Sequence, residues 1–347
     1  MKKNISLLLL VCLIFTVFTS CSGIPFFGTE NGKPNEEDEN QGVEGGKQDS
    51  EDGKQDSEDG EQDSEDGKGN MLNGKKIIFI GNSYIYWGKT VLESKTLTQK
   101  ERQNDKGYFY QLCKKMGAEV EVTNWTFSGH AIGHLFSNEC SKCSCDHKSY
   151  LEDRYYDYVV VSPGAESIFD KTLSKVMNFF KETNPDVKFI VMGTACSYGY
   201  NSTYGDKYTY QKDILADFED QGILIADWGG LMDGIVRGEY TVPNATQTYS
   251  LNSFIVKDGK HGTMLTGYLE AMFVYCVITG ESATALPYDF CLDTSVRKEF
   301  NADTFLSKNT STTYKTNFVE IFKSEADMNG IQQLVDWAIE NKPYRSE

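Results

Sequence analysis

Short apolar runs alternate with segments of helical periodicity along most of residues 71–347. Five runs have the length and composition of buried strands: Ile77–Ile80, Val120–Thr126, Tyr158–Val161, Lys188–Met192 and Ile223–Ala226. Between them, apolar residues at helical spacing predict helices at Tyr108–Met116, Leu173–Thr183 and Tyr210–Glu219. Two more helices are predicted after the fifth run, at Thr263–Thr279, followed by Gly280, and at Gly330–Asn341.

This order of elements predicts the fold class. Strands that alternate with amphipathic helices form a parallel sheet, because each right-handed crossover packs its helix against one face of the sheet. We therefore expect an α/β fold in which helices cover both faces of a five-stranded parallel sheet. Residues 71–347 could form one sizeable domain or two small ones, and the unbroken alternation favours one.

The first 21 residues form a separate unit. Two lysines precede an apolar run from Leu7 to Phe18, and small residues precede Cys21. This is the layout of a secretory signal, and the run is too short for a stable membrane span. Its end resembles a bacterial lipobox, which implies that Cys21 is lipidated and anchors an extracytoplasmic protein to the bacterial cell membrane. The alternative is an ordinary cleaved signal in which Cys21 is incidental.

Residues 22–70 are rich in Gly, Asp, Glu, Gln, Ser and Lys. A seven-residue unit, Lys-Gln-Asp-Ser-Glu-Asp-Gly, starts at Lys47 and Lys54 and recurs with one change at Glu61. No position of the unit is apolar and each unit contains a glycine, which argues against a coiled coil. The segment holds 4 lysines against 16 acidic residues and carries most of the formal net charge of −17. We expect an extended, solvated tether, with partner binding as the alternative.

Ser83 is the first candidate for chemistry. The strand expected at Ile77–Ile80 runs into Gly81, Asn82 and Ser83. Open α/β proteins place their reactive groups at the carboxyl edge of the sheet, where this turn would hold the serine. Alone, however, a Gly-Asn-Ser sequence after a strand is more often a plain turn.

Asp258 and His261 supply what a serine nucleophile needs. A serine hydroxyl is a weak nucleophile until a base takes its proton, and a histidine held by a carboxylate is the usual base at neutral pH. By themselves the two residues could be a helix N-cap and an exposed histidine. Together with Ser83 they predict a catalytic triad, in which the backbone N–H groups of Ser83 and Gly129 would donate to the oxyanion.

These stretches resemble, in order, the sequence blocks of the GDSL or SGNH hydrolases. Residues 80–84, Ile-Gly-Asn-Ser-Tyr, are similar to the first block, residues 124–129 to the second, which supplies the oxyanion glycine, and residues 258–261 to the last. The resemblance covers about residues 76–280. It implies a flavodoxin-like three-layer α/β/α fold with strand order 2-1-3-4-5, and ester hydrolysis through Ser83, His261 and Asp258.

One block departs from the family pattern. After the third strand the family has Gly-x-Asn, whose side chain donates to the oxyanion, whereas Glu166 stands at this place here. An ionised carboxylate only accepts hydrogen bonds. Losing one such donor costs about 3 kcal/mol of transition-state stabilisation. We expect Asn82, His130 and Glu166 to lie at the pocket; the alternatives are that Asn82 only forms the turn and His130 only caps a loop.

A second cluster of reactive side chains lies at residues 140–147. Its candidate metal ligands are Cys140, Cys143, Cys145 and His147. Cys and His are the preferred ligands of zinc, and four of them close a structural site. The spacing is not that of a zinc finger, and disulfides compete in an oxidising compartment. Of the 9 cysteines, seven remain once Cys12 and Cys21 are set aside, so at least one cannot pair within the chain. Zinc, disulfides and free thiols stay open.

Together these features predict a lipid-anchored serine esterase that hydrolyses acyl esters, acetyl esters among them. The 20 Tyr, 20 Phe and 4 Trp residues point weakly to esters on glycans, since aromatic faces stack on sugar rings but mostly lie in the core. The alternatives are an acyltransferase with the same triad and a non-catalytic surface-binding lipoprotein. The triad requires no cofactor. We expect a small-molecule or glycan ester as the partner, contact with the membrane only through the lipid, and no nucleic acid.

Overall fold

The structure is a computed structural model that describes residues 70–92, 99–136, 150–151, 153–164, 169–193, 212–256, 261–289 and 324–345. These residues belong to one compact unit, Asp63–Glu347. Among them, none of the helices has the length and hydrophobicity needed to cross a bilayer. Cys21 and the acidic repeats lie outside the described residues, so the expectations for them stay predictions.

Five parallel strands form one sheet. They are β1 (Lys76–Gly81), β2 (Glu121–Thr126), β3 (Tyr158–Val161), β4 (Lys188–Met192) and β5 (Leu224–Ala226). Their order in the sheet is β2-β1-β3-β4-β5, and each neighbouring pair is parallel. The predicted fold class and strand order are therefore confirmed. Each predicted strand begins and ends within one residue of an observed strand.

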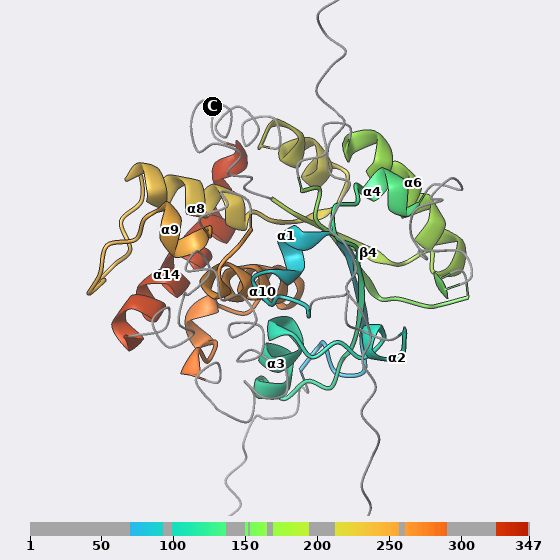
Figure 1. Ribbon diagram of the computed structural model, residues 1–347, viewed down its shortest axis with the longest axis horizontal. Helices are drawn as coiled ribbons and strands as arrows, with labels where there is room; N and C mark the ends of the chain where they lie inside the picture. Colours follow the sequence, from blue (N-terminus) through green and yellow to red (C-terminus); the bar gives the residue numbers. More distant parts are fainter. Residues whose placement is uncertain are drawn as a thin grey trace, which may run out of the picture. The chain divides into compact units, whose positions relative to one another are not determined.

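Helices cover both faces of the sheet (Figure 1). On one face lie α3 (Tyr108–Lys115), α8 (Trp228–Arg237), α10 (Met264–Thr279) and α14 (Glu325–Asn341). On the other lie α4 (Ile132–Leu135), α6 (Phe169–Thr183) and a helix over residues 212–220. The shorter elements are α1 (Ser83–Tyr86), α2 (Gln99–Arg102), α9 (Leu251–Phe254) and two 3₁₀ turns at Ala283–Ala285 and Pro343–Arg345.

Alternate residues of each strand face two separate cores. In β1, Ile77 and Phe79 pack with α3 and α10, whereas Ile78 and Ile80 pack with α4 and α6. This alternation follows from the period of two in a strand, and both sets are apolar because both faces of the sheet are covered. The molecule is therefore built in three layers, α/β/α, as the resemblance implied.

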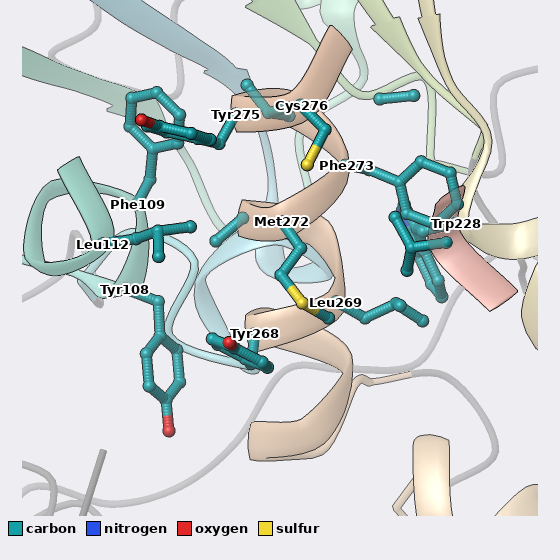
Figure 2. Packing of buried hydrophobic residues seen from close by; sticks show 14 of the residues in the cluster. Tyr108, Phe109, Leu112, Trp228, Tyr268, Leu269, Met272, Phe273, Tyr275 and Cys276 are labelled. Atoms are coloured by element: carbon teal, nitrogen blue, oxygen red, sulfur yellow. The ribbon is translucent and has the colours of Figure 1, made fainter. Parts of the chain in front are cut away.

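The first core is organised around α10. All residues of this helix except Val277 and Thr279 are buried, so it is apolar on every side. Figure 2 shows side chains of α3 on one side of α10 and Trp228 of α8 on the other. The helix begins after Thr263, whose hydroxyl accepts a hydrogen bond from the N–H of Thr266, and ends at Gly280 in the left-handed conformation, φ 73°.

Candidate active site

Ser83 lies directly beyond the carboxyl end of β1. The strand ends at Gly81, Asn82 is an extended N-cap with φ −141°, and Ser83 is the first residue of α1. In the sheet, β2 lies on one side of β1 and β3 lies on the other, so the strand order reverses at β1. Open α/β sheets bind ligands at the carboxyl ends of the strands at such a reversal. The serine therefore begins a short helix rather than ending a simple turn, and it is 9% exposed.

His261 reaches Ser83 from 178 positions further along the chain. Its Nε2 atom lies 2.8 Å from the Oγ atom of Ser83. The backbone of His261 is fixed by a hydrogen bond from the N–H of Val256 to its carbonyl oxygen, 2.9 Å, and by a bridge between Ile255 and Gly262. The structure thus brings together the two residues that the sequence predicted as nucleophile and base. Asp258 and Glu166 lie outside the described residues.

The ring of His261 is stacked on Trp87. The ring centroids are 4.0 Å apart and the planes differ by 12°. Trp87 follows α1, and its N–H donates to the carbonyl oxygen of Ser83 at 3.1 Å, which makes the two residues neighbours one helical turn apart. The sequence analysis did not single out Trp87. Its spacing of four residues from Ser83 is informative only once residues 83–86 are known to be helical.

Asn82 connects the turn after β1 to the loops after β2 and β3. Its Nδ2 atom donates to the carbonyl oxygen of His130 at 3.0 Å, and its Oδ1 atom accepts from the N–H of Tyr84 at 3.1 Å. Gly164, φ 57°, packs against it so closely that a Cβ atom there would lie 3.0 Å from Nδ2. Asn82 does not adopt the left-handed conformation of the turn alternative. It links three strand ends instead.

Gly129 lies in the loop after β2 and directly precedes His130, whose carbonyl oxygen accepts the hydrogen bond from Asn82. Its φ of 71° is left-handed, which glycine adopts without strain. The imidazole Nδ1 of His130 is 2.9 Å from the carbonyl oxygen of Ser128, so the ring caps its own loop. Ser83, as the first residue of α1, has an N–H without an intrahelical acceptor. The two N–H groups expected to donate to an oxyanion therefore belong to segments joined through Asn82.

The segments that carry Ser83 and His261 also pack directly on each other. A Cβ atom on Gly267, in the first turn of α10, would lie 1.8 Å from the carbonyl oxygen of Gly88. No other residue fits at this contact between backbones. The hydroxyl of Thr90 lies 3.2 Å from the carbonyl oxygen of Gly267 and is also hydrogen-bonded to the carboxyl group of Glu270. These contacts fix α10 against the residues that follow α1.

Glu270 is the only charged residue in α10, and it is buried. Burial raises the pKa of its carboxyl group well above the ordinary value of 4.5. The hydroxyl of Thr90 donates to the Glu270 carboxyl group, which lowers the pKa of this group, but burial is the larger cause and acts in the opposite direction.

Among the described residues, no group of three or more His, Cys, Asp or Glu side chains could hold a metal ion. The cluster at residues 140–147 lies outside the described residues, so its zinc site stays a prediction. Cys113 and Cys276 are buried free thiols. Burial raises the pKa of both, which keeps them protonated and unreactive.

Comparison with known proteins adds similarity in fold. No protein-family profile and no curated protein matches the sequence. Among solved structures, an acetylxylan esterase from Geobacillus stearothermophilus is 14% identical, with 61% of this chain and 97% of that chain covered and a TM-score of 0.43. A family 3 carbohydrate esterase from Clostridium thermocellum is 14% identical, with 58% and 93% covered and a TM-score of 0.38.

An alpha/beta hydrolase from the metagenome of Lake Arreo is 15% identical, with 61% of this chain and 98% of that chain covered and a TM-score of 0.44. The structural matches thus include chains described as a putative SGNH hydrolase and as carbohydrate esterases. At these identities the similarity concerns the fold, an α/β architecture around a five-stranded parallel sheet.

Proposed function

We propose that this chain is a serine ester hydrolase in which Ser83 is the nucleophile and His261 the base. The observation that carries the proposal is the 2.8 Å contact between Ser83 Oγ and His261 Nε2 at the carboxyl edge of the sheet. At this distance the imidazole can accept the hydroxyl proton directly, which is the geometric requirement for a general base. A histidine and a serine that only filled the core would have no need of this alignment at the ligand-binding edge.

The reaction would proceed in two halves. Ser83 Oγ attacks the acyl carbon while its proton moves to His261 Nε2, and the carbonyl oxygen takes the electron pair of the broken π bond. The tetrahedral species then expels the alcohol, which receives the proton from His261. Water repeats the sequence on the acyl-enzyme and releases the acid. Asp258 is proposed to hold the imidazole through Nδ1.

The oxyanion would be bound by the backbone N–H groups of Ser83 and Gly129. Donors of this kind contribute about 3 kcal/mol each when they are aligned before the reaction. Their alignment rests on the described contacts of Asn82 with Tyr84 and His130, because these fix both backbone segments relative to each other. No metal or organic cofactor takes part in the proposed steps.

Turnover of a short-chain aryl ester by the full chain in detergent tests the proposal. We expect release of the phenol by the wild type, and a loss of about 10³-fold or more in kcat for Ser83→Ala and His261→Asn. Ser174→Ala, which changes a serine on the exposed side of α6, is the matched control and should retain full activity. Equal rates for the wild type and Ser83→Ala would remove the esterase proposal.

We propose acetyl esters on glycans as the natural substrates. A parallel screen of aryl acetate, aryl butyrate and acetylated polysaccharides tests this, with released acetate as the measurement. Turnover of polysaccharide acetate well above that of the aryl esters supports a glycan substrate. Activity confined to the aryl esters contradicts it and leaves the hydrolase proposal standing.

We also propose that Cys21 carries the lipid that anchors the protein outside the cytoplasm. The support is the arrangement of residues 1–21 alone. Fractionation of cells grown with a labelled fatty acid tests the idea. Label and membrane association should both be lost in Cys21→Ser, whereas an unlabelled, soluble wild-type protein would show that the signal is simply cleaved.

A further inference from the structure

Trp87 and Ser83 approach the same imidazole from one short stretch of backbone. Ser83 Oγ contacts the edge of the His261 ring at Nε2, 2.8 Å away, while the indole of Trp87 covers its face at a centroid distance of 4.0 Å. Tyr84 lies near the same ring, with centroids 6.0 Å apart and planes tilted by 37°. The indole is half-buried and packs against the first core, so its position is fixed by its surroundings.

The stacked geometry leaves the edge of the imidazole available for proton transfer. Planes that differ by 12° place the indole over the ring face, while both nitrogens lie in the ring plane. The face of an indole carries negative electrostatic potential, so it attracts an imidazolium more strongly than a neutral imidazole. The contact is therefore stronger in the state that His261 adopts after it takes the serine proton.

We propose that Trp87 is a positioning residue that holds His261 against Ser83 and stabilises its protonated form during the reaction. The inference rests on the proposed esterase function and extends it. When the Ser83 Oγ–acyl carbon bond forms, the hydroxyl proton passes to Nε2 and the imidazole becomes a cation over the indole. An interaction that strengthens at this step lowers the barrier instead of merely tightening the ground state.

The titratable residues on neighbouring segments are the same in every variant tested. Tyr84 has its ring 6.0 Å from that of His261, Tyr86 and Lys89 lie in or after α1, Tyr268 and Glu270 lie in α10, and His130 lies in the loop bound by Asn82. Asp258 lies outside the described residues. Trp87→Leu removes the aromatic face but keeps an apolar cover on the imidazole, so the desolvation of the ring changes little. Trp87→Phe keeps a smaller aromatic face. Trp337→Leu, on the outer part of α14, makes the same chemical change away from the site and is the matched control.

The pKa of His261 is the first measurement. In the full chain, the imidazole signal that disappears in His261→Asn is followed by NMR through a pH titration. We expect the pKa of His261 to fall by about half a pH unit or more in Trp87→Leu, because the imidazolium loses its cation–π contact. Trp87→Phe should show a smaller fall, and Trp337→Leu none. An unchanged or raised pKa in Trp87→Leu would overturn the proposal.

The pH profile of kcat/KM is the second measurement. The acid limb should move to lower pH in Trp87→Leu by the same amount as the NMR shift, and the plateau should fall about tenfold because the ring is held less precisely. A plateau loss without any shift of the limb would mean that Trp87 only packs, which contradicts the proposal. If Trp87→Leu fails to fold, Trp87→Phe decides by the same two criteria.

The NMR titration also separates this inference from the proposed function. A wild type without esterase activity, in which Trp87→Leu still lowers the pKa of His261, would remove the esterase and hence the catalytic role while confirming the stacking effect. An active wild type whose pKa and pH profile do not respond to Trp87→Leu would remove the inference and leave the esterase standing.

Discussion

The side chain of Asn82 donates a hydrogen bond to the carbonyl oxygen of His130, 3.0 Å away, and so joins the turn after β1 to the loop after β2. Its other side-chain atom accepts from the N–H of Tyr84 and caps α1. The side-chain amide of Asn82, the residue before Ser83, is therefore bonded to His130, the residue after Gly129. The Asn82 side chain thus adds to a backbone hydrogen bond between the same two segments, from the Phe127 N–H to the Gly81 carbonyl oxygen at 3.0 Å.

Asn82→Asp tests this role. The carboxylate keeps the acceptor for Tyr84 but replaces the donor to His130 with an oxygen that repels the carbonyl. We expect a loss of about 1–3 kcal/mol in the free energy of unfolding, measured in urea, and a fall of about tenfold or more in kcat for an aryl ester. Asn341→Asp removes an exposed amide-to-carbonyl bond on α14 and should change neither. Unchanged activity in Asn82→Asp would contradict the role of the link.

Gly129→Ala tests the left-handed backbone of the second loop. A Cβ atom at Gly129 meets no neighbour, so the cost is conformational, about 1–2 kcal/mol of stability. Gly117 is a matched control, because it has φ 77°, equally open surroundings and no part in the site. Both alanine variants should be destabilised to a similar extent, as measured by urea unfolding.

Only Gly129→Ala should lose activity, because relief of its strain moves the N–H that is proposed to bind the oxyanion. A fall of about 10²-fold in kcat is expected for loss of one such donor. Equal kcat values for the two folded variants would exclude the Gly129 N–H from the reaction.

Glu270→Gln should make the protein more stable at high pH. Burial raises the pKa of Glu270 well above 4.5, so above this pH the folded protein keeps a proton that the unfolded chain releases. The free energy of unfolding then falls as pH rises, by about 1.4 kcal/mol per pH unit, until the folded-state pKa is reached. Glutamine is neutral, has the same shape and can still accept the hydrogen bond from the Thr90 hydroxyl through its side-chain oxygen, so it removes this dependence.

Urea unfolding at pH 4, 6 and 8 measures the effect. The two proteins should have similar stability at pH 4, and the glutamine variant should be more stable by about 1 kcal/mol or more at pH 8. Glu182→Gln, an exposed position on α6, provides the control for the general effect of removing a negative charge. A constant difference between wild type and Glu270→Gln across the three pH values would show that Glu270 is not held protonated.

Gly267→Ala should separate the two halves of the site. The new methyl group meets the carbonyl oxygen of Gly88, so the backbones must move apart, at a cost of about 1–3 kcal/mol. Gly330→Ala creates a comparable conflict between α14 and the carbonyl oxygen of Pro243. Both variants should melt at lower temperature, but only Gly267→Ala should reduce the kcat of the folded protein. Full kcat in Gly267→Ala would show that the packing does not set the Ser83–His261 distance.

The strands were predictable because they are buried on both faces. Such strands appear in the sequence as continuous apolar runs, and the run at Tyr158–Val161 coincides with β3 at both ends. α14 begins earlier than predicted, at Glu325, because its first turn is polar. Asp327 is buried there and accepts hydrogen bonds from Thr246, 81 residues away, which local periodicity does not reveal.

α8 was not predicted, since Gly229 and Gly230 disfavour a helix close to its start. The helix forms because the Asp227 side chain caps it by accepting from the N–H of Gly230, and because Gly234 leaves room for the ring of Tyr240. The first cause is a capping hydrogen bond and the second is a packing contact, and helical periodicity in the sequence indicates neither. α1 was missed for a similar reason, since its Tyr-Ile-Tyr sequence favours a strand.

The proximity of Ser83 and His261 could be predicted from the sequence because short motifs mark both residues, in the order of the family blocks. Trp87 could not, since its relation to His261 depends on a helix of four residues and on a contact between segments distant in the chain. Glu270 is marked in the sequence as a carboxylate in an otherwise uncharged helix. A buried acid of this kind requires a partner, here Thr90.

The close contact of Gly88 with Gly267 has a consequence for biosynthesis. Ser83, the proposed nucleophile, is made early and His261, the proposed base, late, so in the proposed esterase a nascent chain would carry an inert serine until α10 docks. Onset of turnover would then report the moment at which the last third of the polypeptide completes its tertiary structure.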